Sequence, residues 1–259
     1  MSRRGTAQLA IVRREIRSLV GSPTGWVVMG GAVAAVLGVA TLSAPGGYQA
    51  TAVDLLVVLE VLVPAVGVAL GYRAVLHDRL SGEWAVHRAM GVRPRTYLQG
   101  VFIGQVTVVG LVIGGSLTVA MAIVAAGRAR PVAFLASSPA VADPSAMLWL
   151  VGLSIGYAVP IVALVMLLSV WAQRRRDAIL GAVVVVGLVV IGLDAAAIVT
   201  AVPLPVMVVL SPGAGYRALV LTVGVGLSAP GPVTAALLGW AVWTLVAVGV
   251  TLRRLGASP

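Results

Sequence analysis

Two carboxylates lie inside apolar stretches, where an ionised group is costly. Glu60 lies about seven residues inside the apolar stretch 53–73, roughly 10 Å below the edge of a membrane-spanning helix. Asp194 lies near the far end of the apolar stretch 178–201. Carboxylates at such depth line ion or substrate pathways, or pair with another group inside a helix bundle.

Glu60 shares one helical stripe with a proline and two glycines. Glu60, Pro64, Gly67 and Gly71 recur at i, i+4, i+7 and i+11. The stripe combines a carboxylate, a kink and two sites of close helix approach. It predicts a pathway-facing or gating surface, or a helix-packing seam in which Glu60 is protonated or internally paired.

Other reactive groups are scarce. All eighteen basic residues are arginine, and the chain has no cysteine. The sequence therefore excludes a GxxxxGK[ST] phosphate loop, a Schiff-base lysine, a thiol nucleophile and a cysteine-ligated metal. His77 and His87 are the two histidines, and neither lies in an HExxH motif, so Glu83 and His87 read as a helix-surface pair. We expect no catalytic residue, no metal and no cofactor in this chain.

Composition indicates a polytopic membrane protein. Hydrophobic residues make up 60% of the 259 residues and charged residues 10%, and the mean hydropathy is +1.07. We expect one all-α membrane domain over residues 1–259. An amphipathic interfacial helix at residues 1–25 forms its N-terminal part, before the first span. Leu9, Val12, Ile16 and Leu19 would form the apolar face of that helix. The predicted spans are residues 26–44, 53–73, 101–126, 147–172, 178–201 and 234–252.

Glycine and proline refine this scheme. Ser22 and Pro23 suit an N-cap and a first helical position before the first span. Four glycines at the third span, Gly100, Gly104, Gly110 and Gly114, form two GxxxG spacings for close helix approach. Five prolines divide residues 202–233 into pieces too short to cross a membrane, which predicts short re-entrant or interfacial helices in an outer loop.

The arginines set the expected orientation. With six spans, fifteen arginines fall on the side of both termini and three on the other side. The positive-inside rule then places both termini in the cytoplasm of a multi-pass cell-membrane protein. Because the net charge of +10 is concentrated at span ends, headgroups explain it, and no nucleic-acid partner is expected.

The polar segment 74–100 between the second and third spans is a candidate docking element. Ser81 and Gly82 open a short helix, and Glu83 near its start favours the helix dipole. Leu80 and Trp84, four residues apart, would present an apolar knob to a partner. An interfacial helix that dips Trp84 into the headgroups is the alternative.

Three stretches resemble type-two ABC exporter permeases. The run GYRAVLHDRLSGEW, residues 71–84, resembles the G-Y-D-A-I-x-x-E-R-E-S-G-T loop after their second span. The segment LSPGAGYRALV, residues 210–220, is similar to their N/S-P-x-x-x-Y-R segment, and residues 240–255 resemble their terminal helix. Arg73, Leu80, Glu83 and Gly91 depart from the pattern. The resemblance covers most of the chain and is stronger to the NosY-like subgroup of this family.

This resemblance implies the permease subunit of an ABC exporter that pairs with a second permease chain as a homodimer. Residues 74–100 would be a coupling loop in a cleft of a separate cytoplasmic ATPase, which binds ATP and Mg²⁺. That arrangement agrees with the missing phosphate loop. The expected docking residues are Asp78, Arg79, Ser81, Gly82, Glu83, Trp84, His87 and Met90.

Other functions stay open. A proton-coupled secondary transporter would use Glu60 and Asp194 as its relay, although no internal repeat supports this. A transport-inactive scaffold would keep only the docking element. Membrane lipids are expected partners in every case, and an extracytoplasmic partner driven mechanically is a further alternative to a transported substrate.

Overall fold

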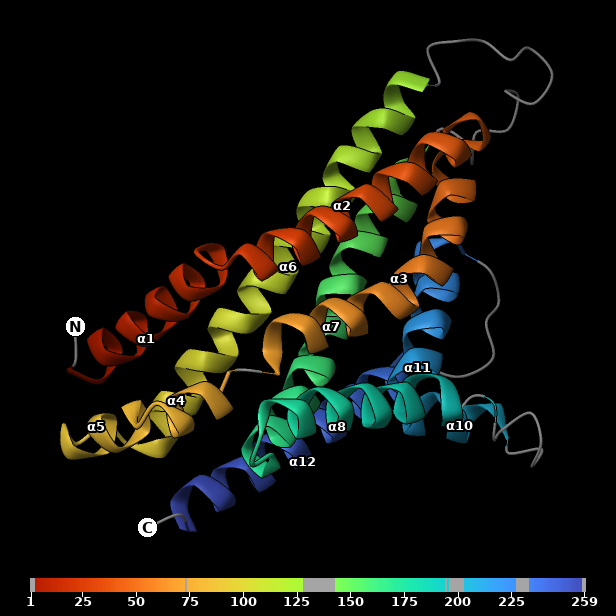
Figure 1. Ribbon diagram of the computed structural model, residues 1–259. Coiled ribbons are helices and arrows are strands. Elements are labelled where there is room, and N and C mark those ends of the chain that lie inside the picture. Colours follow the sequence, from red (N-terminus) through yellow and green to blue (C-terminus); the bar gives the residue numbers. More distant parts are fainter. Residues whose placement is uncertain are drawn as a thin grey trace.

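The computed structural model describes residues 3–72, 74–127, 143–193, 195, 203–226 and 233–257, and all regular secondary structure within them is helical (Figure 1). This confirms the all-α prediction. Among the described residues, four helical stretches are long and apolar enough to cross a membrane: Pro23–Leu80, Pro94–Gly127, Ser145–Trp171 and Val233–Gly256. The first of them contains two long helices, α2 (Pro23–Ser43) and α3 (Gly47–Gly71), which the short helix η1 (Ala44–Gly46) joins.

Three further long helices complete the bundle: α6 (Pro94–Gly127), α7 (Ser145–Trp171) and α12 (Val233–Ala257). Both described ends of the chain, together with the short helices α4 (Leu76–Leu80) and α5 (Glu83–Ala89), lie toward one end of it (Figure 1). Arg254 of α12 stacks over Trp171 of α7, with its Cζ 4.3 Å from the ring centroid. The C-terminal ends of these two helices therefore meet at this same end.

The remaining stretches form shorter helices. In the region of the predicted fifth span, α8 (Arg175–Gly187) continues into the π-helix η3 (Leu188–Gly192), while Asp194 and residues 196–201 lie outside the described residues. The proline-rich stretch contains α10 (Leu204–Leu210), α11 (Pro212–Leu219) and the π-helix η4 (Val220–Gly224). Short helices are thus present where the prolines predicted them.

The N-terminal helix α1 (Arg3–Val20) packs along the first half of α6. Its buried stripe differs from the predicted one, because Ile11 and Glu15 are buried whereas Leu9 is 62% exposed. The first GxxxG pair explains this: a Cβ at Gly100 would lie 2.7 Å from Cγ2 of Ile11, and one at Gly104 would lie 2.9 Å from Cβ of Glu15. The two glycines therefore admit the backbone of α1.

The helix α6 begins before the span predicted at residues 101–126. Tyr97, Leu98 and Gly100 are buried in α6, which begins at Pro94 rather than at the predicted residue 101. Helical order thus extends into the segment predicted as loop. The first span begins as expected, since the Ser22 hydroxyl accepts a 3.4 Å hydrogen bond from the Gly25 backbone and Pro23 opens the helix.

The stripe on α3 is a packing seam against α7. A Cβ at Gly67 would lie 3.0 Å from Cγ2 of Ile161, and one at Gly71 would lie 3.0 Å from Cγ1 of Val165. Pro64 lies inside the same helix and is buried. The two glycines therefore let α3 and α7 approach closely along the half of α3 that leads to α4.

The glycine contacts predict opposite effects for two substitutions in one helix. Gly104→Ala adds a methyl group that contacts Glu15 too closely, whereas Gly115→Ala adds one in open space. Both changes raise helix propensity by roughly 1 kcal/mol. We expect Gly115→Ala to raise the melting temperature of the detergent-purified chain and Gly104→Ala to lower it. Equal shifts in the two variants would contradict the packing of α1 on α6.

Candidate functional site

The segment between α3 and α6 is organised around one guanidinium group. Arg14 of α1 donates from Nη1 to Oδ2 of Asp78 at 2.8 Å and from Nη2 to Oδ1 at 2.6 Å. The same Nη2 donates to Oε2 of Glu83, and Nη1 lies 3.3 Å from Nε2 of His87. We call Arg14, Asp78, Glu83, His87 and Tyr97 the arginine cluster. It joins α1 to both short helices, α4 and α5.

Asp78, the central carboxylate of this cluster, is buried and therefore needs hydrogen-bond donors. Asp78 is 2% exposed, and its Oδ2 accepts a third hydrogen bond, at 2.8 Å, from the hydroxyl of Tyr97 in α6. The hydrogen bond to Asp78 is the main cause that holds the pKa of Arg14 above its usual value. The cost of removing a carboxylate from water is offset only when its oxygens accept hydrogen bonds in this way. Asp78 is therefore a structural partner of Arg14 and Tyr97 rather than a surface residue.

The cluster resembles a metal site in geometry only. One ligand atom each from Asp78, Glu83 and His87 would lie within 4.8 Å of the others, which suits a divalent cation. However, the guanidinium of Arg14 bonds to both carboxylates and lies beside the imidazole. A metal ion would have to displace Arg14, so the cation that these three side chains hold is the arginine.

The prediction that Trp84 forms part of an exposed apolar surface for a partner is wrong. It is 7% exposed and packs on Tyr97, with ring centroids 4.8 Å apart and planes tilted by 52°. It points into the bundle because α5 lies with Glu83 and Trp84 toward α1 and α6. A partner that binds α5 would therefore contact side chains other than Trp84.

The outward surface of α4 and α5 combines apolar and polar side chains. Leu80 and Val86 are each 57% exposed and Met90 is 66% exposed. We call these three residues the outer face. Arg79, Ser81 and Gly82 are also exposed, and Gly82 has a φ of 76°, which glycine adopts readily at the turn between the two helices. Of the expected docking residues, Met90, Arg79, Ser81 and Gly82 are thus accessible, His87 and Glu83 partly so, and Asp78 and Trp84 are not.

The start of α4 is also fixed to α7. The hydroxyl of Ser169 accepts hydrogen bonds from the backbone N–H groups of Val75 at 3.2 Å and Leu76 at 3.0 Å. Arg79 donates from Nη1 to the carbonyl of Val170. Together with the hydrogen bonds that Arg14 and Tyr97 donate to Asp78, these bonds connect α4 to α1, α6 and α7.

A second polar centre lies in the middle of α3. Glu60, which is 7% exposed, accepts from Arg217 of α11: the distance from Nε to Oε2 is 3.2 Å and that from Nη2 to Oε1 is 2.5 Å. A Cβ at Gly213 would lie 3.2 Å from Oε1, so this glycine leaves room for the carboxylate. Of the two interpretations of Glu60, the internally paired one describes the structure.

Aromatic contacts fix α11 beside this pair. Tyr216 stacks on Tyr157 of α7 with centroids 4.7 Å apart and an angle of 8°, and its hydroxyl lies 2.7 Å from that of Ser154. Trp240 of α12 donates from Nε1 to the carbonyl of Pro212 at 3.1 Å. Arg217 follows directly after Tyr216, so these contacts hold its guanidinium toward Glu60.

Sequence reasoning missed Arg14, Glu15 and Arg217. It used Arg14 for topology, and Arg217 for topology and for the Y-R motif of the resemblance, because single arginines near span ends carry no partner information. One signal was present for Glu15: it is the acidic residue of a helix that is otherwise basic and apolar. In the structure its Oε1 accepts a 2.6 Å hydrogen bond from Nε2 of Gln105 in α6.

Removal of the Arg14 side chain should release α4 and α5. Arg14→Gln leaves Asp78 and Glu83 without their cation, which costs on the order of 3–5 kcal/mol for a buried pair and less here because Arg14 is partly exposed. We expect a lower melting temperature and faster tryptic cleavage after Arg79 and Arg88. Arg13→Gln, an exposed neighbour, serves as the control. Equal cleavage in both variants would contradict the role of Arg14.

Glu15 predicts a dependence of stability on pH. The pKa of Glu15 is raised to about 7: burial is the largest cause and the charge of Asp78 adds to it, while the hydrogen bond from Gln105 and the charge of Arg14 lower the pKa. Because the folded pKa exceeds the unfolded value of 4.5, the stabilisation is complete below pH 4.5 and is lost as the pH rises through 7.

The measurement compares the wild type with Glu15→Gln. Between pH 4.5 and 8.5, the melting temperature of the wild type should fall relative to that of the variant by roughly several degrees, because the buried Glu15 carboxyl ionises less readily in the folded chain than in the unfolded chain. Parallel curves would show that Glu15 does not titrate differently in the folded chain.

Comparison with known proteins identifies no relative: neither a scan against protein-family models nor a search of curated proteins finds a match to this chain.

Proposed function

We propose that this chain is the permease subunit of an ABC exporter of the type-two class. In this proposal α4 and α5 form the coupling element, six spans place both termini in the cytoplasm, and a separate ATPase supplies the energy. The observation that carries it is the combination of an exposed apolar outer face with rigid attachment of the same two helices to α1, α6 and α7.

The attachment matters because force must pass from the docking surface to the spans. A short helix on a flexible tether would bind a partner without moving the bundle. Here Arg14 and Ser169 fix α4 to two other helices, and α4 follows α3 after a few residues. Movement of the outer face, driven by ATP-dependent closure of the partner, would therefore tilt α1 and α3 together.

The path continues along α3 to Glu60. Since Gly67 and Gly71 pack against α7 and Glu60 pairs with Arg217, a tilt of α3 would act on α11 at the far part of the bundle. This supports a gating role for the stripe through the ion pair with Arg217. A proton relay is less well supported, because the guanidinium already occupies both oxygens of Glu60.

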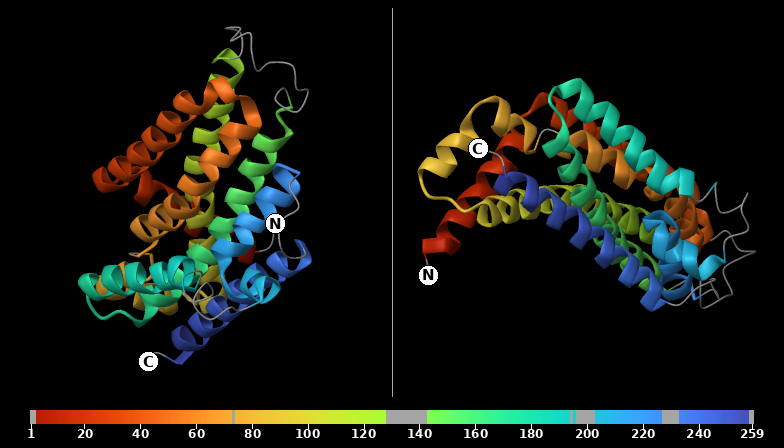
Figure 2. Two further views of the ribbon diagram at one scale, coloured as in Figure 1. Left: turned by 90° about the vertical axis from the view of Figure 1, so that its right-hand side faces the viewer. Right: turned by 90° about the horizontal axis from the view of Figure 1, so that it is seen from below.

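The homodimer is proposed from α8. This helix lies at the edge of the bundle in both views of Figure 2. Three apolar side chains of α8, together with Leu188 at the start of η3, are between 51% and 64% exposed: Leu180, Val183, Val184 and Leu188. Such a surface faces lipid or a second copy of the chain, and the second copy is the partner that a permease pair requires.

The outer face tests the docking proposal. Met90→Glu, or Val86→Glu, places a charge on this surface and should abolish copurification of a Walker-motif ATPase from the native host, detected by mass spectrometry. Arg176→Glu, at an exposed residue in the first turn of α8, is the control and should retain the ATPase.

Two results would contradict the proposal. Wild-type chain that copurifies with no Walker-motif protein would remove the basis for an ABC subunit. Undiminished copurification with Met90→Glu and Val86→Glu would place docking elsewhere on the chain.

A further inference from the structure

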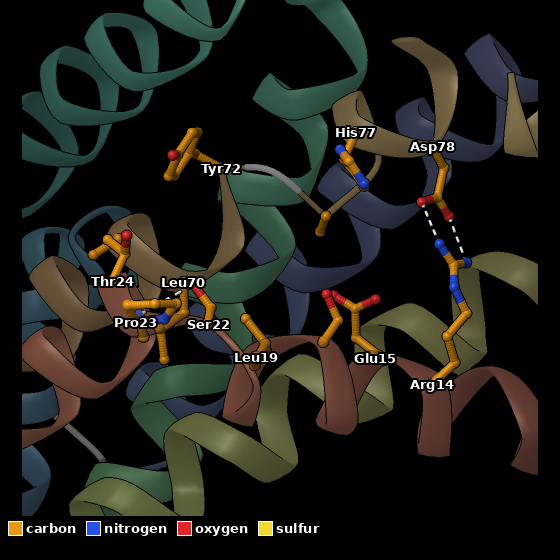
Figure 3. Close-up of a pocket in the computed structure, with 14 residues that line it drawn as sticks. Arg14, Glu15, Leu19, Ser22, Pro23, Thr24, Leu70, Tyr72, His77 and Asp78 are labelled. Atoms are coloured by element: carbon orange, nitrogen blue, oxygen red, sulfur yellow. Dashed lines mark hydrogen bonds and ion pairs between the residues drawn. The ribbon is translucent and has the colours of Figure 1, made fainter. Parts of the chain in front are cut away.

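A cavity of about 400 Å³ lies where α1, the beginning of α2 and the end of α3 meet (Figure 3). Carboxyl and hydroxyl groups line it from three directions: Glu15 and Ser18 from α1, Ser22 and Thr24 from the start of α2, and Tyr72 and Asp78 from the segment after α3. A volume of this size accommodates a small organic group rather than a single ion.

Glu15 provides a buried carboxylate in this cavity. The residue is 8% exposed, its Oε1 accepts the hydrogen bond from Gln105, and no hydrogen bond to its Oε2 is present among the described residues. Figure 3 shows the carboxylate directed toward the side of the cavity where His77 and Tyr72 lie. One oxygen of Glu15 is therefore available to a donor from a ligand.

The surrounding charges favour a cation. Among the described lining residues, Arg14 carries the one guanidinium, and it is bonded to Asp78 and Glu83. Glu15 thus has no cation of its own among the described lining residues, although the chain as a whole has a net charge of +10. The imidazole of His77 and the phenol of Tyr72 add hydrogen-bonding groups near the carboxylate.

We propose that this cavity binds a primary ammonium group, with Glu15 as its counterion. An ammonium carries three donors, which match Oε2 of Glu15 and the neighbouring acceptors. The start of α2 lies at the cavity with the hydroxyls of Ser22 and Thr24, where the helix dipole favours an anion. The chemistry therefore suits an ethanolamine phosphate, either as a phospholipid headgroup or as a free molecule.

This inference does not depend on the proposed function. The cavity is formed by α1, α2, α3 and α4, and the outer face takes no part in it. Loss of ammonium binding would leave ATPase docking untouched, and loss of docking would leave ammonium binding untouched.

The experiment uses the full chain in detergent at pH 8 and measures its melting temperature and its retained lipids by native mass spectrometry. The probes are an ethanolamine phospholipid, the choline phospholipid with the same acyl chains, free phosphoethanolamine, and NaCl at matched ionic strength. Choline lacks N–H donors, so it reports binding that needs only a phosphate and acyl chains. Variants are Glu15→Gln and, as control, Asp54→Asn, an exposed carboxylate elsewhere on the chain.

We expect the ethanolamine lipid to bind at least ten-fold more tightly than the choline lipid, and Glu15→Gln, but not Asp54→Asn, to abolish this preference. Stabilisation by free phosphoethanolamine would identify a soluble ligand, and an effect of the lipid alone would identify a headgroup; both support the ammonium site. Equal binding of the two lipids, an effect of NaCl equal to that of the amines, or an unchanged preference in Glu15→Gln would overturn it. Folding of Glu15→Gln is checked by its melting transition.

Discussion

The contact between Arg14 and Asp78 is the interaction on which the polar end of this bundle depends. Asp78 is buried, so it needs donors, and Arg14 and Tyr97 supply them from two different helices. Glu83 shares the same guanidinium and thereby sets the orientation of α5. That orientation buries Trp84 and leaves Val86 and Met90 on the outside. The surface offered to a partner thus follows from one arginine.

The two polar centres lie at different levels of the bundle, and α3 connects them. Its glycines allow the approach of α7, and its Glu60 holds α11 through Arg217. Helices packed this closely move as units rather than bend locally. A displacement that begins at α4 therefore reaches Arg217 with few flexible steps between, which is the physical basis of the proposed coupling.

Sequence reasoning succeeded where a local rule applied. Apolar length, Ser22 with Pro23 as a helix start, and the prolines of residues 202–233 depend on neighbours in the chain, so helices were found near their expected positions. It failed where the position of a residue depends on contact with a segment that is distant in the sequence. Gly100 and Gly104 accept α1, and Trp84 turns inward to Tyr97; neither partner is visible from spacing alone. The pairing of Glu60 was anticipated as one of two alternatives, but its partner Arg217 was not.

The most direct test of the account asks whether α5 is fixed to α1. Because the chain has no native cysteine, Val86→Cys and Arg13→Cys introduce two unique spin-label sites, one on each helix. Double electron–electron resonance on the detergent-purified chain should give one narrow distance distribution, which broadens when Arg14→Gln is added. A broad distribution in the chain that retains Arg14, or one that Arg14→Gln leaves unchanged, would contradict the central role of this arginine.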